Sequence, residues 1–195
     1  LQYYKKGDFR TELATMGCRT RVIGNAFDPK NEVVTGRGNL SFTSINLPRL
    51  GIEAKGDIDK FFELLEDRMY LVKKQLIKRF KLQCSKKVYN YPFLMGQGIW
   101  LGSDKLGPTD DISEVLCHGT LSIGFIGLAE CLVALIGEHH GQSDEAQELG
   151  LKIVGHMRKM TDDWQKEWYT LSTGKKVHLN WGIIGTPKMV GTHSI

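Results

Sequence analysis

The segment from residue 120 to 139 constrains the fold most, because it has almost no polar face. Its apolar residues are Leu121, Ile123, Phe125, Ile126, Leu128, Ala129, Leu132, Val133, Leu135 and Ile136. A helix that is apolar on nearly every side must be buried on most sides. We therefore predict a buried helix here, in a chain whose 195 residues, 41% of them hydrophobic, can supply the surrounding core.

Two amphipathic patterns flank this segment and predict long helices. The first runs over about 57–83, has Asp57 as its expected N-cap, and repeats apolar residues every three or four positions. The second follows Ser143 and runs over about 144–172, where Gly174 ends it. Both patterns are typical of helices that bury one face against a core.

Strand-like segments lie at 19–23, 39–47 and 177–184. The turn-rich residues 28–32 between the first two predict a hairpin-like excursion. Strands that alternate with long helices indicate an α/β architecture rather than a helical bundle.

The charge of the chain is mild, with 26 Lys and Arg against 22 Asp and Glu. Such a scattered excess does not require nucleic acid or an anionic membrane as a partner, although basic residues could hold a phosphorylated small molecule. No run approaches 18 apolar residues, so we expect no membrane-spanning helix. The chain starts at Leu1, and we expect it to be a piece of a longer protein.

The four cysteines, Cys18, Cys84, Cys117 and Cys131, are far apart and form no Cys-x-x-Cys pair. This spacing argues against zinc or iron–sulfur sites and favours a reducing, cytoplasmic compartment. No metal site is expected at Glu138-His139-His140 either, because adjacent histidines on a helix do not share a face.

Cys18 lies in Met16-Gly17-Cys18-Arg19-Thr20-Arg21, and two interpretations are open. A free cysteine usually behaves as a small core residue. Alternatively, the preceding glycine allows a tight loop, and the two arginines could perturb the thiol or bind an anion.

Two further segments also allow two interpretations each. Gly36-Arg37-Gly38-Asn39 marks either a strand entry or a close approach to a ligand. His118-Gly119-Thr120-Leu121-Ser122 opens the predicted buried helix, so Thr120 is either an ordinary cap or part of an anion site at a helix N-terminus.

Taken together, these segments resemble the anaerobic (class III) ribonucleoside-triphosphate reductases, which are glycyl radical enzymes. The matching blocks are Met16-Gly17-Cys18-Arg19-Thr20, Gly38-Asn39-Leu40, Ile45-Asn46-Leu47-Pro48-Arg49, Tyr91-Pro92-Phe93-Leu94-Met95-Gly96, His118 to Glu130, and Asn180-Trp181 to Thr186-Pro187. They occur in the family's order from about residue 15 to 187. They cover only the later-middle part of a family member several times longer.

The resemblance implies part of the family's ten-stranded α/β barrel, with residues 1–195 as a single partial catalytic domain and a finger loop over about 15–49. Cys18 matches the cysteine that becomes a thiyl radical, and Asn39 matches the polar residue beside the ribose. Met16 matches the pattern of formate-using members.

Substrate contacts are implied for four more residues. Gly119, Thr120 and Ser122 would lie along the substrate cavity, and Thr186 would lie near the phosphates. The tail 188–195 departs from the family's sequence.

The family also implies cofactors and partners. The stored radical belongs to a glycine absent from this chain and is generated by a radical S-adenosylmethionine iron–sulfur activase. Formate is the expected reductant, zinc belongs only to the missing C-terminal part, and no metal is expected in this chain. The expected partners are ribonucleoside triphosphates, the activase and a second copy in a homodimer, with no nucleic acid and no membrane.

Two other functions are compatible with parts of the sequence. One is a sister glycyl radical enzyme of the formate-acetyltransferase type, against which the Met-Gly-Cys-Arg-Thr context and Asn39 argue. The other is a non-catalytic nucleotide-binding fragment. We expect the 195-residue chain by itself to be inactive.

Overall fold

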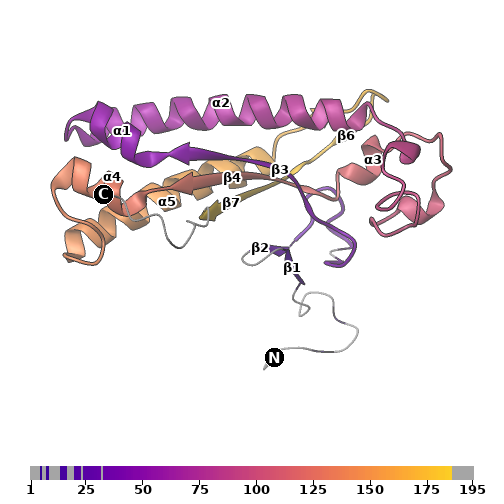
Figure 1. Cartoon of the computed structure of the whole chain (residues 1–195), viewed down its shortest axis with the longest axis horizontal. Helices are drawn as coiled ribbons and strands as arrows, with labels where there is room; N and C mark the ends of the chain where they lie inside the picture. Colours follow the sequence, from indigo (N-terminus) through magenta and orange to yellow (C-terminus); the bar gives the residue numbers. More distant parts are fainter. Residues whose placement is uncertain are drawn as a thin grey trace. The chain divides into compact units, whose positions relative to one another are not determined.

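The computed structural model describes residues 5, 8, 14–16, 20–22, 24–31 and 33–185 (Figure 1). The chain divides into two compact units. One gathers Leu1–Ser41, Leu76–Ser122 and Asp162–Gly182, and the other gathers Phe42–Gln75, Ile123–Thr161 and Ile183–Ile195. The prediction of a single domain over 1–195 stays a prediction.

The main sheet consists of β3 (Asn39–Asn46), β4 (Thr120–Ile126) and β7 (Asn180–Gly185), in the order β3-β4-β7. The three arrows run in the same direction (Figure 1). Each strand is separated from the next along the chain by helices, as parallel pairing requires. The chain is therefore a mixed α/β protein, which confirms the predicted fold class.

The predicted helix over 120–139 is wrong in its first half. Residues Thr120–Ile126 form the central strand β4, and only Leu128–Ile136 form a helix, α4. Residues 121–124 of the strand are all buried. A strand covered on both faces reads as a continuous apolar run, which periodicity alone does not distinguish from a buried helix.

Gly127 marks the junction between β4 and α4. Its φ of 71° lies in the left-handed region, which residues with a side chain rarely adopt. A Cβ at this position would also lie 2.3 Å from Cγ of Pro48. The glycine therefore ends the strand and lets the helix start close to the chain that follows β3.

The two long helices confirm the amphipathic patterns and their caps. Helix α2 spans Ile58–Cys84, and the Asp57 carboxylate accepts a hydrogen bond from the Lys60 N–H at 2.9 Å. Helix α5 spans Asp144–Gln165, and the Ser143 hydroxyl accepts one from the Ala146 N–H at 3.2 Å. The predicted end of α5 at residue 172 is wrong, because the chain has already turned into a short strand.

That short strand, β5 (Tyr169–Thr170), pairs antiparallel with β6 (Lys176–Val177). The predicted strand 177–184 is thus divided between β6 and β7. Three short helical turns follow α2 along the chain: η2 (Val88–Asn90), η3 (Ser103–Lys105) and α3 (Ser113–Leu116).

Helix α1 (Leu47–Ala54) follows β3 directly and packs against α4. Asn46 is its N-cap, and the side chain of Asn46 accepts a hydrogen bond from the Arg49 N–H. A Cβ at Gly51 would lie 2.9 Å from the carbonyl oxygen of Cys131, so the absence of a side chain allows the two helices to approach closely.

Strands β1 (Ala14–Met16) and β2 (Thr20–Val22) form an antiparallel pair in which Met16 lies opposite Thr20. The hairpin-like excursion predicted between 19–23 and 39–47 is therefore wrong for the described residues, where β2 pairs with β1 and β3 pairs with β4. The local turn signal at 28–32 did not reveal which strand each arm would pair with. No helix in the described part of the chain is long and apolar enough to cross a membrane.

The junction at Gly127 yields a stability prediction. Gly127→Ala forces a side chain into a left-handed conformation and against the Pro48 ring, so we expect it to destabilise the chain by about 2 kcal/mol or more. Gly155→Ala is the matched control, because no atom lies within 4 Å of the added Cβ and alanine favours the α5 helix by about 0.5–1 kcal/mol. Urea denaturation followed by circular dichroism gives both values. Equal stability of the two variants would contradict the left-handed conformation of Gly127 and its contact with Pro48.

Candidate functional site

Two of the predicted site residues are in direct contact at the start of the sheet. Asn39 is the first residue of β3, and Ser122 is the third residue of β4. The Ser122 hydroxyl donates a hydrogen bond to Oδ1 of Asn39 at 2.9 Å. Ser122 is 1% exposed, whereas Asn39 is partly exposed. The pair thus connects a buried group to one that a ligand can reach.

Gly119 and Thr120 hold the same ends of β3 and β4 together. The Thr120 N–H donates to the carbonyl oxygen of Gly38 at 2.9 Å. A Cβ at Gly119 would lie only 2.5 Å from Cγ of Leu40. Both interpretations of Thr120, as a helix cap and as part of an anion site at a helix N-terminus, are wrong, because Thr120 begins a strand. A substrate-binding role for Gly119, Thr120 and Ser122 stays a prediction without that support.

Asn180, the first residue of β7, is a buried polar residue that the sequence analysis did not single out as a site residue. Its Oδ1 accepts a hydrogen bond from the Ala26 N–H at 2.7 Å. Its Nδ2 lies within hydrogen-bond distance of the Cys117 and Gly119 carbonyl oxygens and of Oδ1 of Asn25, at 3.0, 3.4 and 3.2 Å. Because the backbone groups are a fixed donor and fixed acceptors, they determine which way the Asn180 amide is turned.

The Asn180 amide in turn fixes the tautomer of His118. Asn25 accepts from Asn180 through Oδ1, so Nδ2 of Asn25 is the atom that faces Nδ1 of His118, at 3.0 Å. Nδ1 must then accept, and the proton of a neutral imidazole resides on Nε2. Burial lowers the pKa of His118, and the charge of Arg37 lowers it further. The ring is therefore neutral at physiological pH.

Arg37 is a buried cation beside this network. It is 8% exposed, and its guanidinium donates to the carbonyl oxygens of His118 and Val33 at 2.9 and 3.1 Å. These bonds join the segment before β3 to the segment before β4. Arg37 is close to Asn39 in the sequence, but only the structure reveals that the Arg37 side chain points into the protein.

Three other predicted site residues are not placed. Cys18 and Thr186 lie outside the described residues, and for Met16 the structure describes only the backbone. Met16 and Thr20 are partners in the β1–β2 pair, so Cys18 lies in the sequence between two paired strands. The roles predicted for Cys18, Met16 and Thr186 stay predictions.

The remaining three cysteines are buried core residues. Cys84, Cys117 and Cys131 are free, and burial raises the pKa of each thiol to about 12. The Cys117 thiol also donates to the carbonyl oxygen of Ser113 at 3.3 Å. These thiols are protonated and have no access to a substrate in solution.

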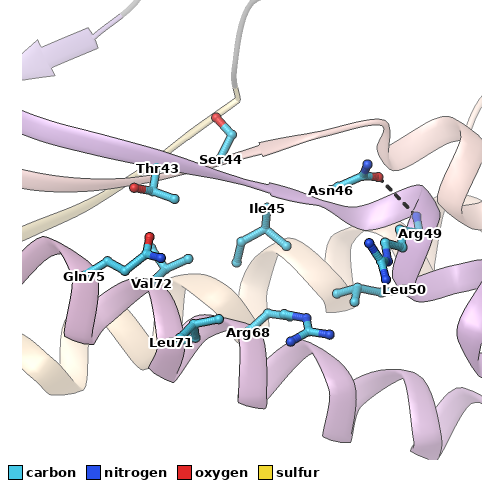
Figure 2. A pocket seen from close by; sticks show the side chains of 10 residues that line it. All are labelled: Thr43, Ser44, Ile45, Asn46, Arg49, Leu50, Arg68, Leu71, Val72 and Gln75. Carbon is cyan, nitrogen blue, oxygen red and sulfur yellow. Dashed lines mark hydrogen bonds between the residues drawn. The ribbon is translucent and has the colours of Figure 1, made fainter.

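The second unit contains a groove of about 380 Å³ between β3, the start of α1 and the middle of α2 (Figure 2). Its floor is apolar, with Ile45, Leu50 and Val72. Arg49 and Arg68 lie on its rim, but Arg49 is already paired with Glu53 at 2.7 Å. The Glu53 carboxylate also interacts electrostatically with Arg68. Its negative charge therefore weakens the attraction of both arginines for an anionic ligand.

The described residues contain no cluster of three His, Cys, Asp or Glu side chains that could hold a metal ion. The strongest candidate site is the set of polar groups near the starts of β3, β4 and β7: the Asn39–Ser122 pair and the hydrogen-bonded Asn180, Asn25 and His118 side chains. Such a site can hydrogen-bond a polar substrate without changing the charge near it.

The sheet, its long helices and this neutral polar cluster define an α/β protein with a candidate site at the strand ends. A family model described as anaerobic ribonucleoside-triphosphate reductase matches residues 1–187, and the chain belongs to this family. The match favours the reductase over the formate-acetyltransferase type.

Individual relatives carry the same description. The anaerobic ribonucleoside-triphosphate reductases of Escherichia coli and Salmonella typhimurium are 34% and 35% identical over 164 residues, which is 83% of this chain. The one of enterobacteria phage T4 is 30% identical over 77% of the chain. The chain spans only 22% of the length of the two bacterial relatives and 24% of the phage protein.

Buried thiols with raised pKa values predict resistance to alkylation. In a Cys18→Ala variant, folded protein at pH 8 should take up no iodoacetamide, because a pKa of about 12 leaves about one thiol in ten thousand ionised. In urea, where the thiols are exposed, mass spectrometry should find three labels. Rapid labelling of the folded variant would contradict the described core.

The same raised pKa values predict how stability depends on pH. The buried, protonated thiols contribute fully to the free energy of unfolding below pH 9, and this contribution is lost as the pH rises toward 12.

Proposed function

We propose that the chain is the central catalytic segment of an anaerobic reductase that converts ribonucleoside triphosphates to deoxyribonucleoside triphosphates. The observation that carries the proposal is the family match over 1–187, together with the position of Cys18 in the sequence between two paired strands. A cysteine between paired strands suits a loop that presents one side chain to a substrate.

Cys18 is the proposed radical-forming cysteine. The other three cysteines are buried in the core, where a substrate cannot reach them, and so do not fit the role. As a thiyl radical, Cys18 would take the hydrogen from the ribose 3′ carbon, after which water leaves from the 2′ carbon. This chemistry depends on holding the sulfur in line with one C–H bond in a site that excludes water.

Asn39 is the proposed hydrogen-bonding partner of the ribose. Its amide is neutral and lies at the partly exposed end of a buried contact with Ser122. A neutral partner suits a thiol that must stay protonated until its hydrogen atom is removed, because a nearby cation would favour the thiolate. Met16, two residues before Cys18, is proposed to line the same pocket, and Thr186 to lie near the phosphates.

The wider assignment follows from the family. A stored glycyl radical, when present, supplies the unpaired electron, and we propose that its glycine lies elsewhere in a longer protein. We also propose a radical S-adenosylmethionine activase as partner, formate as reductant, a zinc site outside this segment, a homodimer and a cytoplasmic location. The 195-residue chain by itself would then reduce nothing.

The direct test is Cys18→Ser in the full-length reductase. A hydroxyl does not readily pass on the radical, so deoxynucleotide formation should fall below detection while the glycyl radical still forms on activation. Product is measured by chromatography and the radical by electron paramagnetic resonance.

Cys117→Ser is the matched control, because a hydroxyl at 117 can still donate to the Ser113 carbonyl and should cost stability at most. Substantial deoxynucleotide production by Cys18→Ser would refute the role of Cys18. Loss of turnover in both variants would indicate a general folding defect.

A further inference from the structure

We propose that Ser122 is a positioning residue: it fixes the side-chain amide of Asn39 so that Asn39 meets the substrate as a hydrogen-bond donor. This inference rests on the proposed function, since it assumes that Asn39 faces the ribose. It changes the role that the sequence suggested for Ser122, from a direct substrate contact to a group that acts through Asn39.

The contact itself gives the amide a direction. The Ser122 hydroxyl donates to Oδ1 of Asn39 at 2.9 Å, so the acceptor end of the amide is engaged inside the protein. Oδ1 and Nδ2 are the two ends of one planar group, and fixing the first turns the second away from Ser122. Asn39 is partly exposed, and in this proposal its N–H donor end is the end that meets the ligand.

Ser122 is well placed to hold this direction because its surroundings are rigid. It is 1% exposed on the central strand. On the neighbouring strand β7, a Cβ at Gly182 would lie 3.9 Å from the Ser122 hydroxyl oxygen and 3.3 Å from Cγ2 of Thr120. Strand β7 therefore lies directly beside the Ser122 side chain.

The backbone that carries Asn39 is also fixed. The Thr120 N–H donates to the Gly38 carbonyl oxygen at 2.9 Å, and Leu40 packs onto Gly119 so closely that a Cβ there would lie 2.5 Å from its Cγ. Residues on both sides of Asn39 are therefore anchored to β4. The hydrogen bond from the Ser122 hydroxyl to Oδ1 restricts the rotation of the amide.

A donor at this position matches the chemistry of a ribose. Hydroxyl oxygens accept hydrogen bonds, and an amide N–H can donate to one without adding a charge. A carboxylate at 39 would still accept from Ser122 but could not donate to the ribose. The proposal therefore distinguishes Asn39→Asp from the wild type even though the two side chains have nearly the same shape.

The experiment is a double-mutant cycle in the full-length protein without radical activation, so that inactive variants can still be measured. Calorimetry gives the Kd for a ribonucleoside triphosphate in the wild type, Asn39→Ala, Ser122→Ala and the double variant. Asn39→Ala should weaken binding roughly tenfold, the value of one hydrogen bond, and Ser122→Ala at least about threefold. In the Asn39→Ala background, Ser122→Ala should change nothing further.

Two further variants sharpen the result. Asn39→Asp should bind no better than Asn39→Ala. Ser103→Ala is the matched control, because Ser103 is also 1% exposed and donates from its hydroxyl to the Trp100 carbonyl oxygen at 2.7 Å. It should lower the Tm about as much as Ser122→Ala and leave the Kd unchanged. If Ser122→Ala does not fold, Ser122→Cys, a weaker donor of similar size, replaces it in the cycle.

The outcomes separate the inference from the proposed function. If Ser122→Ala weakens binding by the same factor with and without Asn39, or not at all, Ser122 does not act through Asn39 and the inference is overturned. If Asn39→Ala binds the nucleotide as well as the wild type does, Asn39 is not a ribose partner, and that part of the proposed function fails with it.

Discussion

The side chain of Asn180 is the contact on which the arrangement at the start of the sheet depends. One amide, 3% exposed, accepts from the Ala26 N–H and faces the carbonyl oxygens of Cys117 and Gly119. Without it, the carbonyl oxygens of the buried Cys117 and Gly119 and the part-buried Ala26 N–H would lose a partner, and each buried unsatisfied group costs about 1–3 kcal/mol. The amide thus holds the backbone just before β4, the strand that carries Ser122.

The polar side chains of this site are neutral, and Arg37 is a buried cation beside them. Asn39 and Ser122 are neutral, and burial together with Arg37 keeps His118 neutral as well. The buried Arg37 guanidinium is bound to backbone carbonyl oxygens of His118 and Val33. A neutral polar site is a poor place for acid–base catalysis through ionised groups, but it suits a reaction that needs a protonated thiol and a positioned substrate.

Much of the local structure could be predicted from the sequence, because the signals were local. Asp57 and Ser143 cap the long helices as their residue types predict, and β3 begins at Asn39 as expected. The segment after Gly119 was assigned wrongly, because a central strand with both faces buried has the same apolar composition as a buried helix. The role of Asn180 could not be predicted either: its partners lie more than 60 positions away in the sequence, and no local pattern brings them together. For Thr186, the family resemblance alone supports a role.

The most direct test of the account is the structure of the full-length protein with a bound ribonucleoside triphosphate, determined without radical activation. We predict that Nδ2 of Asn39 lies within about 3 Å of a ribose oxygen, a normal hydrogen-bond distance, with Oδ1 still bound to Ser122 and the Cys18 sulfur facing the 3′ carbon. A nucleotide bound away from Asn39 would contradict this prediction. So would a Cys18 sulfur more than about 15 Å from Asn39, because side chains in contact approach within ~4.5 Å.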